Sequence, residues 1–197
     1  MTMDEILGTV SLEDAKRNCP WSGTENAIRT SKKEVIGNRL IKKNLIMARF
    51  YGERAIRVTD KDEQLKGVDF KTSKRNIDVK VSIGDFRDDN IRYFECVPVE
   101  IAQNGQISFT REKLTTDVLF VNVNLDTNLV WFVSVPMETI LKIVAVNCST
   151  CPFDRLHPLW AESKTSKNGS GVFVKVQISK LADLPGVLVE KVPLTEK

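Results

Sequence analysis

Histidine is nearly absent from this sequence, with His157 the single one among 197 residues. A metal site built from two or three histidines is therefore impossible, and nucleases that depend on histidine-bound metal are excluded. A Ser-His-Asp triad would need His157, which lies in RLHPLW with no nucleophile motif beside it. If the chain is an enzyme, we expect carboxylates and lysines to carry the chemistry.

Other features that the sequence lacks limit its expected location and partners. No apolar run approaches the roughly 20 residues that span a bilayer, and the acidic start lacks the layout of a signal peptide. We therefore expect a cytoplasmic protein whose four cysteines are reduced thiols. The net charge of +3 is too small to indicate a nucleic-acid partner by itself, so that prediction must rest on local basic clusters.

Hydrophobic patterning predicts a single α/β (α+β) domain, 1–197, in which helices flank a central mixed β-sheet. The expected elements are a helix over 31–50, a hairpin over 67–82, strands over 91–101, 117–123, 129–135 and 172–179, and a helix that opens at Pro136. The strands over 117–123 and 129–135 are almost continuously apolar, which indicates burial on both faces. The core is expected over roughly 31–146, and the segment 147–171 is expected to be irregular and rich in loops.

The helix predicted over 31–50 has a broad apolar side and a basic side. The apolar side holds Ile36, Leu40, Ile41, Leu45, Met47 and Ala48. The basic side holds Arg39, Lys42, Lys43 and Arg49. Gly52 follows as a stop signal.

The hairpin GVDFKTSKRNIDVKVS places charge on strands that otherwise alternate cleanly. Its apolar positions are Val68, Phe70, Ile77, Val79 and Val81. The opposite face carries two carboxylates, Asp69 and Asp78, and the amine of Lys80. Whether Asp69 lies across from Asp78 depends on the register of the hairpin.

This arrangement resembles the PD-(D/E)XK nuclease superfamily, most of all a small type II restriction endonuclease. Val68-Asp69 stands for the PD element, and the run from Asp78 to Lys80 stands for the (D/E)XK element. Glu34, in the preceding helix, matches the position where many members carry another acidic residue. The resemblance covers roughly 31–135 as an order of elements and implies a restriction-endonuclease-like fold.

The resemblance implies Mg²⁺-dependent hydrolysis of phosphodiester bonds in double-stranded DNA. Two carboxylates on neighbouring strands could converge on one ion, which offsets their repulsion and suits the preference of Mg²⁺ for oxygen ligands. Lys80 could orient or deprotonate the attacking water, or stabilise the transition state. The implied catalytic residues are Asp69, Asp78 and Lys80; the implied metal ligands are Asp69, Asp78 and the main-chain carbonyl of Val79, with Glu34 and Glu95 as further candidates.

Several of these residues have a plainer interpretation. Asp69, Asp78 and Lys80 could form a solvated strand face with an exposed ion pair. Glu34 could complete a capping box with Ser31 at the start of a helix, and Glu95 could pair with a basic residue. Asp117, just before a buried strand, is more simply a charge at the strand edge.

The spacing Cys148-x-x-Cys151 raises zinc binding or a redox role. With His157 the pair supplies three ligands, whereas a structural zinc site needs four, and nothing places Cys19 nearby. A thioredoxin-type motif needs the pair at a helix N-terminus after a strand. Two ordinary thiols in a turn is the favoured interpretation.

Basic residues flank the proposed site in three groups, which could contact the DNA backbone or read bases. They are the basic side of the first helix, the hairpin turn and a later loop: Arg39, Lys42, Lys43 and Arg49; Lys71, Lys74 and Arg75; Lys164, Lys167 and Asn168. Each group by itself could equally be a solvated basic face.

The sequence therefore predicts a Mg²⁺-dependent endonuclease, favouring a type II restriction enzyme that acts as a homodimer on palindromic DNA. A Holliday-junction resolvase-like nuclease and a phage or repair nuclease are alternatives. A DNA-binding protein that keeps the scaffold without activity, and a binding protein with an accidental motif, belong to other classes.

Overall fold

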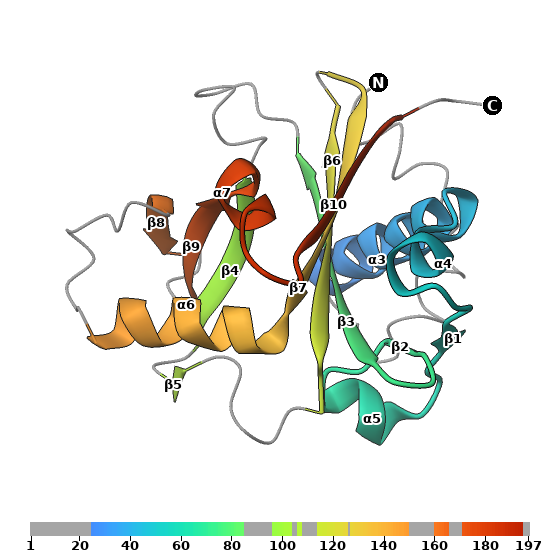
Figure 1. Cartoon of the computed structure of the whole chain (residues 1–197), viewed down its shortest axis with the longest axis horizontal. Helices are drawn as coiled ribbons and strands as arrows, with labels where there is room; N and C mark the ends of the chain where they lie inside the picture. The colour runs from blue at the N-terminus through green and yellow to red at the C-terminus, as the bar shows by residue number, and fades with distance from the viewer. Residues whose placement is uncertain are drawn as a thin grey trace.

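Two β-sheets organise the chain (Figure 1). The computed structural model describes residues 25–84, 96–103, 106–107, 114–125, 127–149, 160–165 and 171–194. A six-stranded sheet has the order β1-β2-β3-β6-β7-β10, and a four-stranded sheet has the order β5-β4-β9-β8. The larger sheet is mixed, because β3 and β6 run parallel while its other neighbours are antiparallel. The predicted central mixed sheet flanked by helices is therefore confirmed.

The elements follow in chain order. The larger sheet is built from β1 (Ile56–Arg57), β2 (Phe70–Lys71), β3 (Asn76–Gly84), β6 (Asp117–Asn124), β7 (Leu129–Pro136) and β10 (Leu188–Pro193). The smaller sheet is built from β4 (Cys96–Gln103), β5 (Gln106–Ile107), β8 (Trp160–Thr165) and β9 (Gly171–Gln177). The described helices are α3 (Glu25–Lys43), α4 (Ile46–Tyr51), α5 (Lys61–Leu65), α6 (Met137–Ser149) and α7 (Ile178–Ala182).

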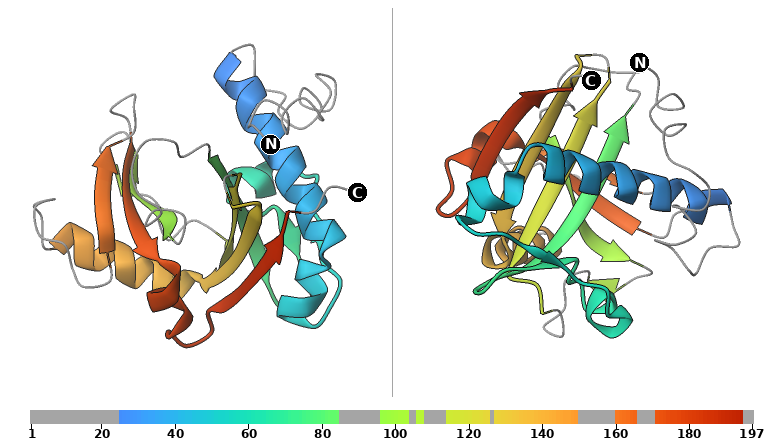
Figure 2. Two further views of the ribbon diagram at one scale, coloured as in Figure 1. Left: turned by 90° about the horizontal axis from the view of Figure 1, so that it is seen from above. Right: turned by 90° about the vertical axis from the view of Figure 1, so that its right-hand side faces the viewer.

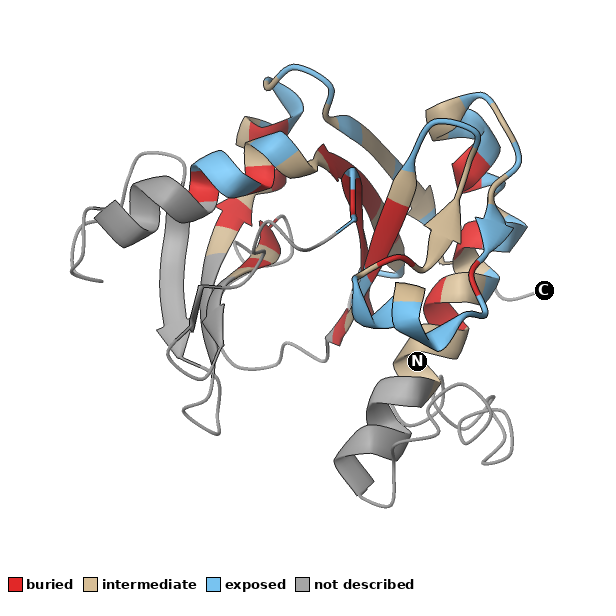
Figure 3. Cartoon of the chain, turned by 90° about the horizontal axis from the view of Figure 1, so that it is seen from below, coloured by how far each residue is buried: buried red, intermediate tan, exposed pale blue. Residues whose placement is uncertain are grey.

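The central strands β6 and β7 are buried on both faces, as their apolar runs predicted. Alternate residues belong to two hydrophobic cores. Leu119 and Phe132 pack in the core under α3 and α4, whereas Phe120 and Val133 pack in the core shared with β4, β9, α6 and α7. Figure 3 shows these strands as the red interior between exposed outer elements. The larger sheet is therefore the middle layer of the molecule.

Helix α3 crosses the outer face of the larger sheet (Figure 2). It approaches β3 closely at Gly37, where an added Cβ would lie 2.4 Å from a methyl carbon of Val81. Glycine at this position thus permits a contact that any larger residue would obstruct.

The predicted helix over 31–50 is two helices in the structure. α3 ends at Lys43, and Leu45 separates it from α4 with a left-handed backbone (φ 52°). Leu45 is 66% exposed, so its placement on the apolar side was wrong, and Ala48 is exposed too. Met47 is buried as predicted, and Gly52 ends α4 with φ 70°.

The C-terminal part of the chain holds more regular structure than the sequence indicated. The segment 147–171 was expected to be irregular, yet it includes the end of α6 and the strand β8. The strand predicted over 172–179 is β9, which ends at Gln177, so Ile178 and Ser179 belong to α7 instead. A further strand that was not predicted, β10, pairs with β7 along its whole length. The charged run 60–66 forms α5, whose first turn is capped by the side chain of Asp60.

Among the helices that the structure describes, none is both long enough and apolar enough to cross a membrane.

Candidate active site

The register of the β2–β3 hairpin brings the two predicted aspartates together. Phe70 pairs with Ile77, and the N–H of Asp69 donates to the carbonyl of Ile77 at 2.9 Å. Asp69 therefore lies across from Asp78, the next residue along β3. The sequence left this register open, and the fold places both carboxylates at the same end of the hairpin.

The side chain of Asp69 lies against the main chain of β3 where its ladder with β2 ends. Its Oδ2 accepts a hydrogen bond from the N–H of Val79 at 2.7 Å. In an extended strand the N–H and C=O of one residue point to the same edge. The carbonyl of Val79 consequently faces this open edge beside Asp69, the position that a main-chain metal ligand requires.

Asp78 is a buried carboxylate with one satisfied oxygen. Its side chain is 3% exposed, and Oδ1 lies 2.9 Å from Nζ of Lys80. Within the described part of the chain, the buried Oδ2 has no hydrogen-bond partner. An unsatisfied buried carboxylate oxygen is costly, which makes it a candidate ligand for a cation.

Burial and the like charge of Asp78 raise the pKa of Asp69 to about 7. The hydrogen bond from Val79 N–H acts in the opposite direction, as does the charge of Lys80. Two carboxylates held this close repel each other unless a proton or a metal ion lies between them. Binding of a proton or a cation between the two carboxylates would therefore relieve their repulsion.

Glu34 lies on α3, within electrostatic range of Asp78 and Lys80. Burial raises its pKa, while the positive charges of Arg57 and Lys80 counteract this and Asp78 adds to it. Ser31 lies inside α3, which begins at Glu25, so the interpretation of Ser31 and Glu34 as a capping box is wrong. Glu34 is thus a third carboxylate whose charge interacts with Asp78 and Lys80.

Lys80 is a cation whose amine faces the aspartates. Burial by itself would lower the pKa of Lys80, but attraction to Asp78 and the hydrogen bond with it outweigh that effect and raise the pKa. The side chain is 47% exposed, so the amine also reaches solvent. A half-exposed ammonium beside two carboxylates can donate to water or to a phosphate oxygen.

Glu100 is a charge near Lys80 that sequence reasoning missed. It lies on β4, in the smaller sheet, and its charge also raises the pKa of Lys80. Its sequence signal is a lone acid in an apolar strand, the same signal that led to Glu95. Glu95 itself lies outside the described residues.

The donors present suit Mg²⁺. In the part of the chain that the structure describes, no three acidic, cysteine or histidine side chains form a ready-made metal cage. Magnesium is commonly held by only one or two carboxylates, with water and substrate phosphate completing six ligands. Asp69, Asp78 with its unsatisfied Oδ2, and the Val79 carbonyl supply that kind of partial, oxygen-only site.

The predicted basic residues include several with interactions inside the chain. Among the described residues, Arg49 pairs with Glu190, Lys71 with Glu63 at 2.6 Å, and Arg75 with Asp117 at 2.6 Å. Arg39 and Lys42 line a cavity beside α3, and Lys43 and Lys74 are exposed.

Asp117 was predicted to be a charge at the strand edge, but the structure buries it. Its side chain is 1% exposed and accepts from both Arg75 and the hydroxyl of Thr116, at 2.6 and 2.7 Å. The guanidinium of Arg75 also lies 5.5 Å from the ring centre of Tyr51. Arg75 therefore has a structural function near the base of β6.

The remaining predicted residues lie on α6 and β8 or outside the residues that the structure describes. Lys164 lies on β8 and Cys148 in the last turn of α6, so Cys148 is not at a helix N-terminus as a thioredoxin-type motif requires. The others lie outside the described residues: Cys19, Cys151, His157, Lys167 and Asn168.

Comparisons with protein-family models, with curated proteins and with solved structures found no match to this chain.

Proposed function

We propose that this chain is a Mg²⁺-dependent endonuclease that hydrolyses phosphodiester bonds in double-stranded DNA, with the restriction-endonuclease-like arrangement of the PD-(D/E)XK superfamily. One observation carries the proposal. Asp69 and Asp78 are held side by side at a strand edge, the buried Oδ2 of Asp78 is unsatisfied, and the half-exposed amine of Lys80 lies 2.9 Å from Asp78 Oδ1. A solvated strand face would leave both carboxylates in water, whereas here Asp78 is buried.

Asp69, Asp78 and the Val79 carbonyl would hold the ion. When bound, Mg²⁺ supplies a lowered pKa for a coordinated water and neutralises charge on the phosphate. The Val79 N–H fixes the orientation of the Asp69 carboxylate through its hydrogen bond to Oδ2. Burial of Asp78 keeps bulk water from competing for its free oxygen.

Lys80 acts as a cation. Attraction to Asp78 keeps its amine protonated at neutral pH, so it orients the attacking water or stabilises charge on the phosphate in the transition state rather than removing a proton. Glu34 and Glu100 approach Lys80 from α3 and β4 and supply further negative charge around it.

Within this proposal, a small type II restriction enzyme that works as a homodimer is the favoured form. It rests on the resemblance of the hairpin motif and on the two-fold symmetry of palindromic sites.

The test is cleavage by the purified protein with millimolar Mg²⁺, on a long duplex and on a four-way junction. Asp78→Asn and Lys80→Ala serve as variants, and Lys142→Ala, an exposed lysine of α6, is the matched control. We expect the two site variants to lose activity by at least about 10²-fold, while the control cuts like the wild type.

Discrete duplex fragments would support a restriction enzyme, and cutting confined to the junction would support a resolvase. Equal cutting by the wild type and both site variants, or no cutting of either substrate, would refute the proposal. DNA binding without any cutting would favour a scaffold that has lost activity.

A further inference from the structure

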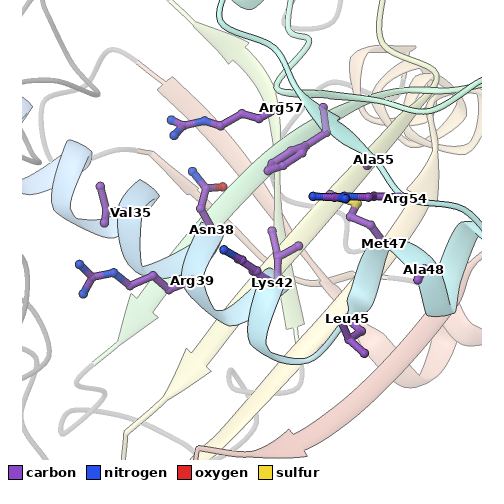
Figure 4. Close-up of a pocket in the computed structure, with 12 residues that line it drawn as sticks. Val35, Asn38, Arg39, Lys42, Leu45, Met47, Ala48, Arg54, Ala55 and Arg57 are labelled. Atoms are coloured by element: carbon purple, nitrogen blue, oxygen red, sulfur yellow. The ribbon is translucent and has the colours of Figure 1, made fainter.

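A large cavity lies between α3, α4 and the segment that leads into β1 and β2 (Figure 4). Its volume is about 690 Å³, within the range of sites that bind small molecules (roughly 300–1,000 Å³). Its floor is apolar: Ile41 and Met47 are only 3% and 7% exposed, and Phe70 contributes an aromatic side chain. Such a floor favours an apolar group over water.

Positive charge lies at the rim of this cavity. Lys42 comes from α3 and Arg54 from the segment before β1, and both are exposed (Figure 4). Within the part of the chain that the structure describes, neither forms an ion pair. The described residues that line the cavity include the amide of Asn38 but no acid. An anionic group at the rim would therefore meet two cations that no described carboxylate already pairs.

The cavity is separate from the candidate active site. Phe70 lines the cavity and packs with Ile77 and Val79 in the core under α3 and α4. Alternation along the two strands of the hairpin directs Asp69 and Asp78 to the opposite face. A ligand in the cavity would consequently leave the carboxylates open to metal and DNA.

We propose that this cavity binds a small anionic amphiphile, a molecule with an apolar body and a single carboxylate or phosphate head. The body would pack on the floor, and the head would pair with Lys42 and Arg54. A neutral amphiphile would lack these ion pairs, and a cationic one would meet like charge, so the head group decides which amphiphile binds. The inference goes beyond the proposed nuclease function and does not depend on it.

A second copy of the chain could cover the same apolar surface. In a two-fold contact centred on the cavity, the partner would bring its own Lys42 and Arg54 toward the first pair. Like charges that face each other oppose association. The charge at the rim thus favours an anionic ligand over self-association, and the oligomeric state is one arm of the test.

The test is isothermal titration calorimetry of the full chain in EDTA with hexanoate, octanoate and decanoate, each below its micelle concentration. Every methylene that enters the cavity should tighten binding by about fourfold. Decyl phosphate, which carries the alternative anionic head, should bind at least as tightly as decanoate if the natural ligand is a phosphate, and more weakly if it is a carboxylate. Decan-1-ol and decylammonium should bind at least about tenfold more weakly than the better anion.

Charge reversal at the rim supplies the first variant. It carries Lys42→Glu and Arg54→Glu, and its matched control carries Lys142→Glu and Lys191→Glu at exposed lysines of α6 and β10. We expect the charge variant to bind decanoate at least about tenfold more weakly and to bind decylammonium more tightly than the wild type does. A loss of fold could not produce the second effect. The control should bind all ligands like the wild type.

Filling the cavity supplies an independent variant. Ala48 is an exposed residue of α4 that lines the cavity. Ala48→Trp should occupy part of the volume, so that the gain in affinity with each methylene ends at a shorter chain while hexanoate still binds. Circular dichroism and thermal melting of each variant check that the fold is retained.

Equal binding of decanoate by the charge variant and its control would overturn the inference, as would an affinity that does not depend on chain length or on Ala48→Trp. A dimer in sedimentation that Ala48→Trp dissociates would assign the cavity to a second copy instead. Because the titration uses neither DNA nor Mg²⁺, its outcome is independent of cleavage. A protein that cuts nothing but binds decanoate in this variant-sensitive way supports the cavity and refutes only the nuclease proposal.

Discussion

Replacing Asp69 with asparagine should stabilise the metal-free protein, even though it should remove nuclease activity. Burial and the charge of Asp78 raise the pKa of Asp69 from 3.8 to about 7. Because the folded pKa is above the unfolded one, the contribution of Asp69 to stability is fully present below about pH 4. It is lost as the pH rises through about 7. At higher pH the folded protein holds an ionised carboxylate at a net cost.

The size of this cost follows from the shift. A shift of about 3 units corresponds to roughly 4 kcal/mol at pH 8. Asparagine keeps an acceptor for the Val79 N–H, but the hydrogen bond loses its ionic character, which costs about 1 kcal/mol. We therefore expect Asp69→Asn to raise the free energy of unfolding by roughly 2–3 kcal/mol at pH 8. That corresponds to an increase in Tm of roughly 5–10 °C for a chain of this length.

The assay is thermal and urea unfolding of wild type and Asp69→Asn in EDTA from pH 4 to pH 8. Asp183→Asn, an exposed acid at the end of α7, is the matched control and should have little effect at any pH. The stabilisation by Asp69→Asn should vanish near pH 4, where Asp69 is protonated in the folded wild type. A variant that is destabilised at pH 8, or that shows the same difference at pH 4 and pH 8, would contradict the electrostatic description of the site.

Three further predictions concern the metal site and the packing around it. Ca²⁺ or Mg²⁺ at ten times its Kd should raise the free energy of unfolding of the wild type by roughly 1.4 kcal/mol. Asp78→Asn should abolish this shift in a thermal melt, and an equal shift in both proteins would exclude Asp78 as a ligand. Gly37→Ala should lower the free energy of unfolding by about 1 kcal/mol, because overpacking against Val81 outweighs the gain in helix propensity. Adding Val81→Ala should recover part of this loss in a double-mutant cycle measured by urea unfolding, and additive losses would refute the close packing. Arg75→Ala should cost about 2–4 kcal/mol by leaving the buried Asp117 charge uncompensated, and Asp117→Asn in the same chain should restore stability unless the ion pair is unimportant.

Much of the central fold could be predicted because it depends on local pattern. The strands β6 and β7 are almost continuously apolar, and only burial on both faces accommodates such strands. The β2–β3 hairpin alternates with period two, which separates Ile77 and Val79 from Asp78 and Lys80 whatever the strand pairs with. The strand β8 and the position of β10 escaped prediction. Pairing between distant segments, rather than propensity, decides whether a short polar stretch becomes a strand.

Leu45 illustrates how tertiary packing overrides a helical pattern. Helical periodicity places it with Ile41 on the apolar side. In the structure the chain adopts a left-handed conformation at Leu45, and a separate helix, α4, begins at the next residue. Helical periodicity assumes one continuous axis, so a break changes the face of every residue that follows. The same break turns Leu45 outward, toward the cavity next to α3.

The sequence by itself determined the chemistry that the protein has at its disposal. A single histidine removes metal sites built from two or three histidines, and period-two alternation places Asp78 and Lys80 on one face of one strand. The tertiary structure decided which distant groups join them. Register places Asp69 across from Asp78, and sheet packing brings the charge of Glu100 near Lys80. The fold also gathers Arg54 and Arg57 with the cations of α3. Backbone geometry fixes the period of a strand locally, whereas convergence between segments depends on how whole sheets and helices pack.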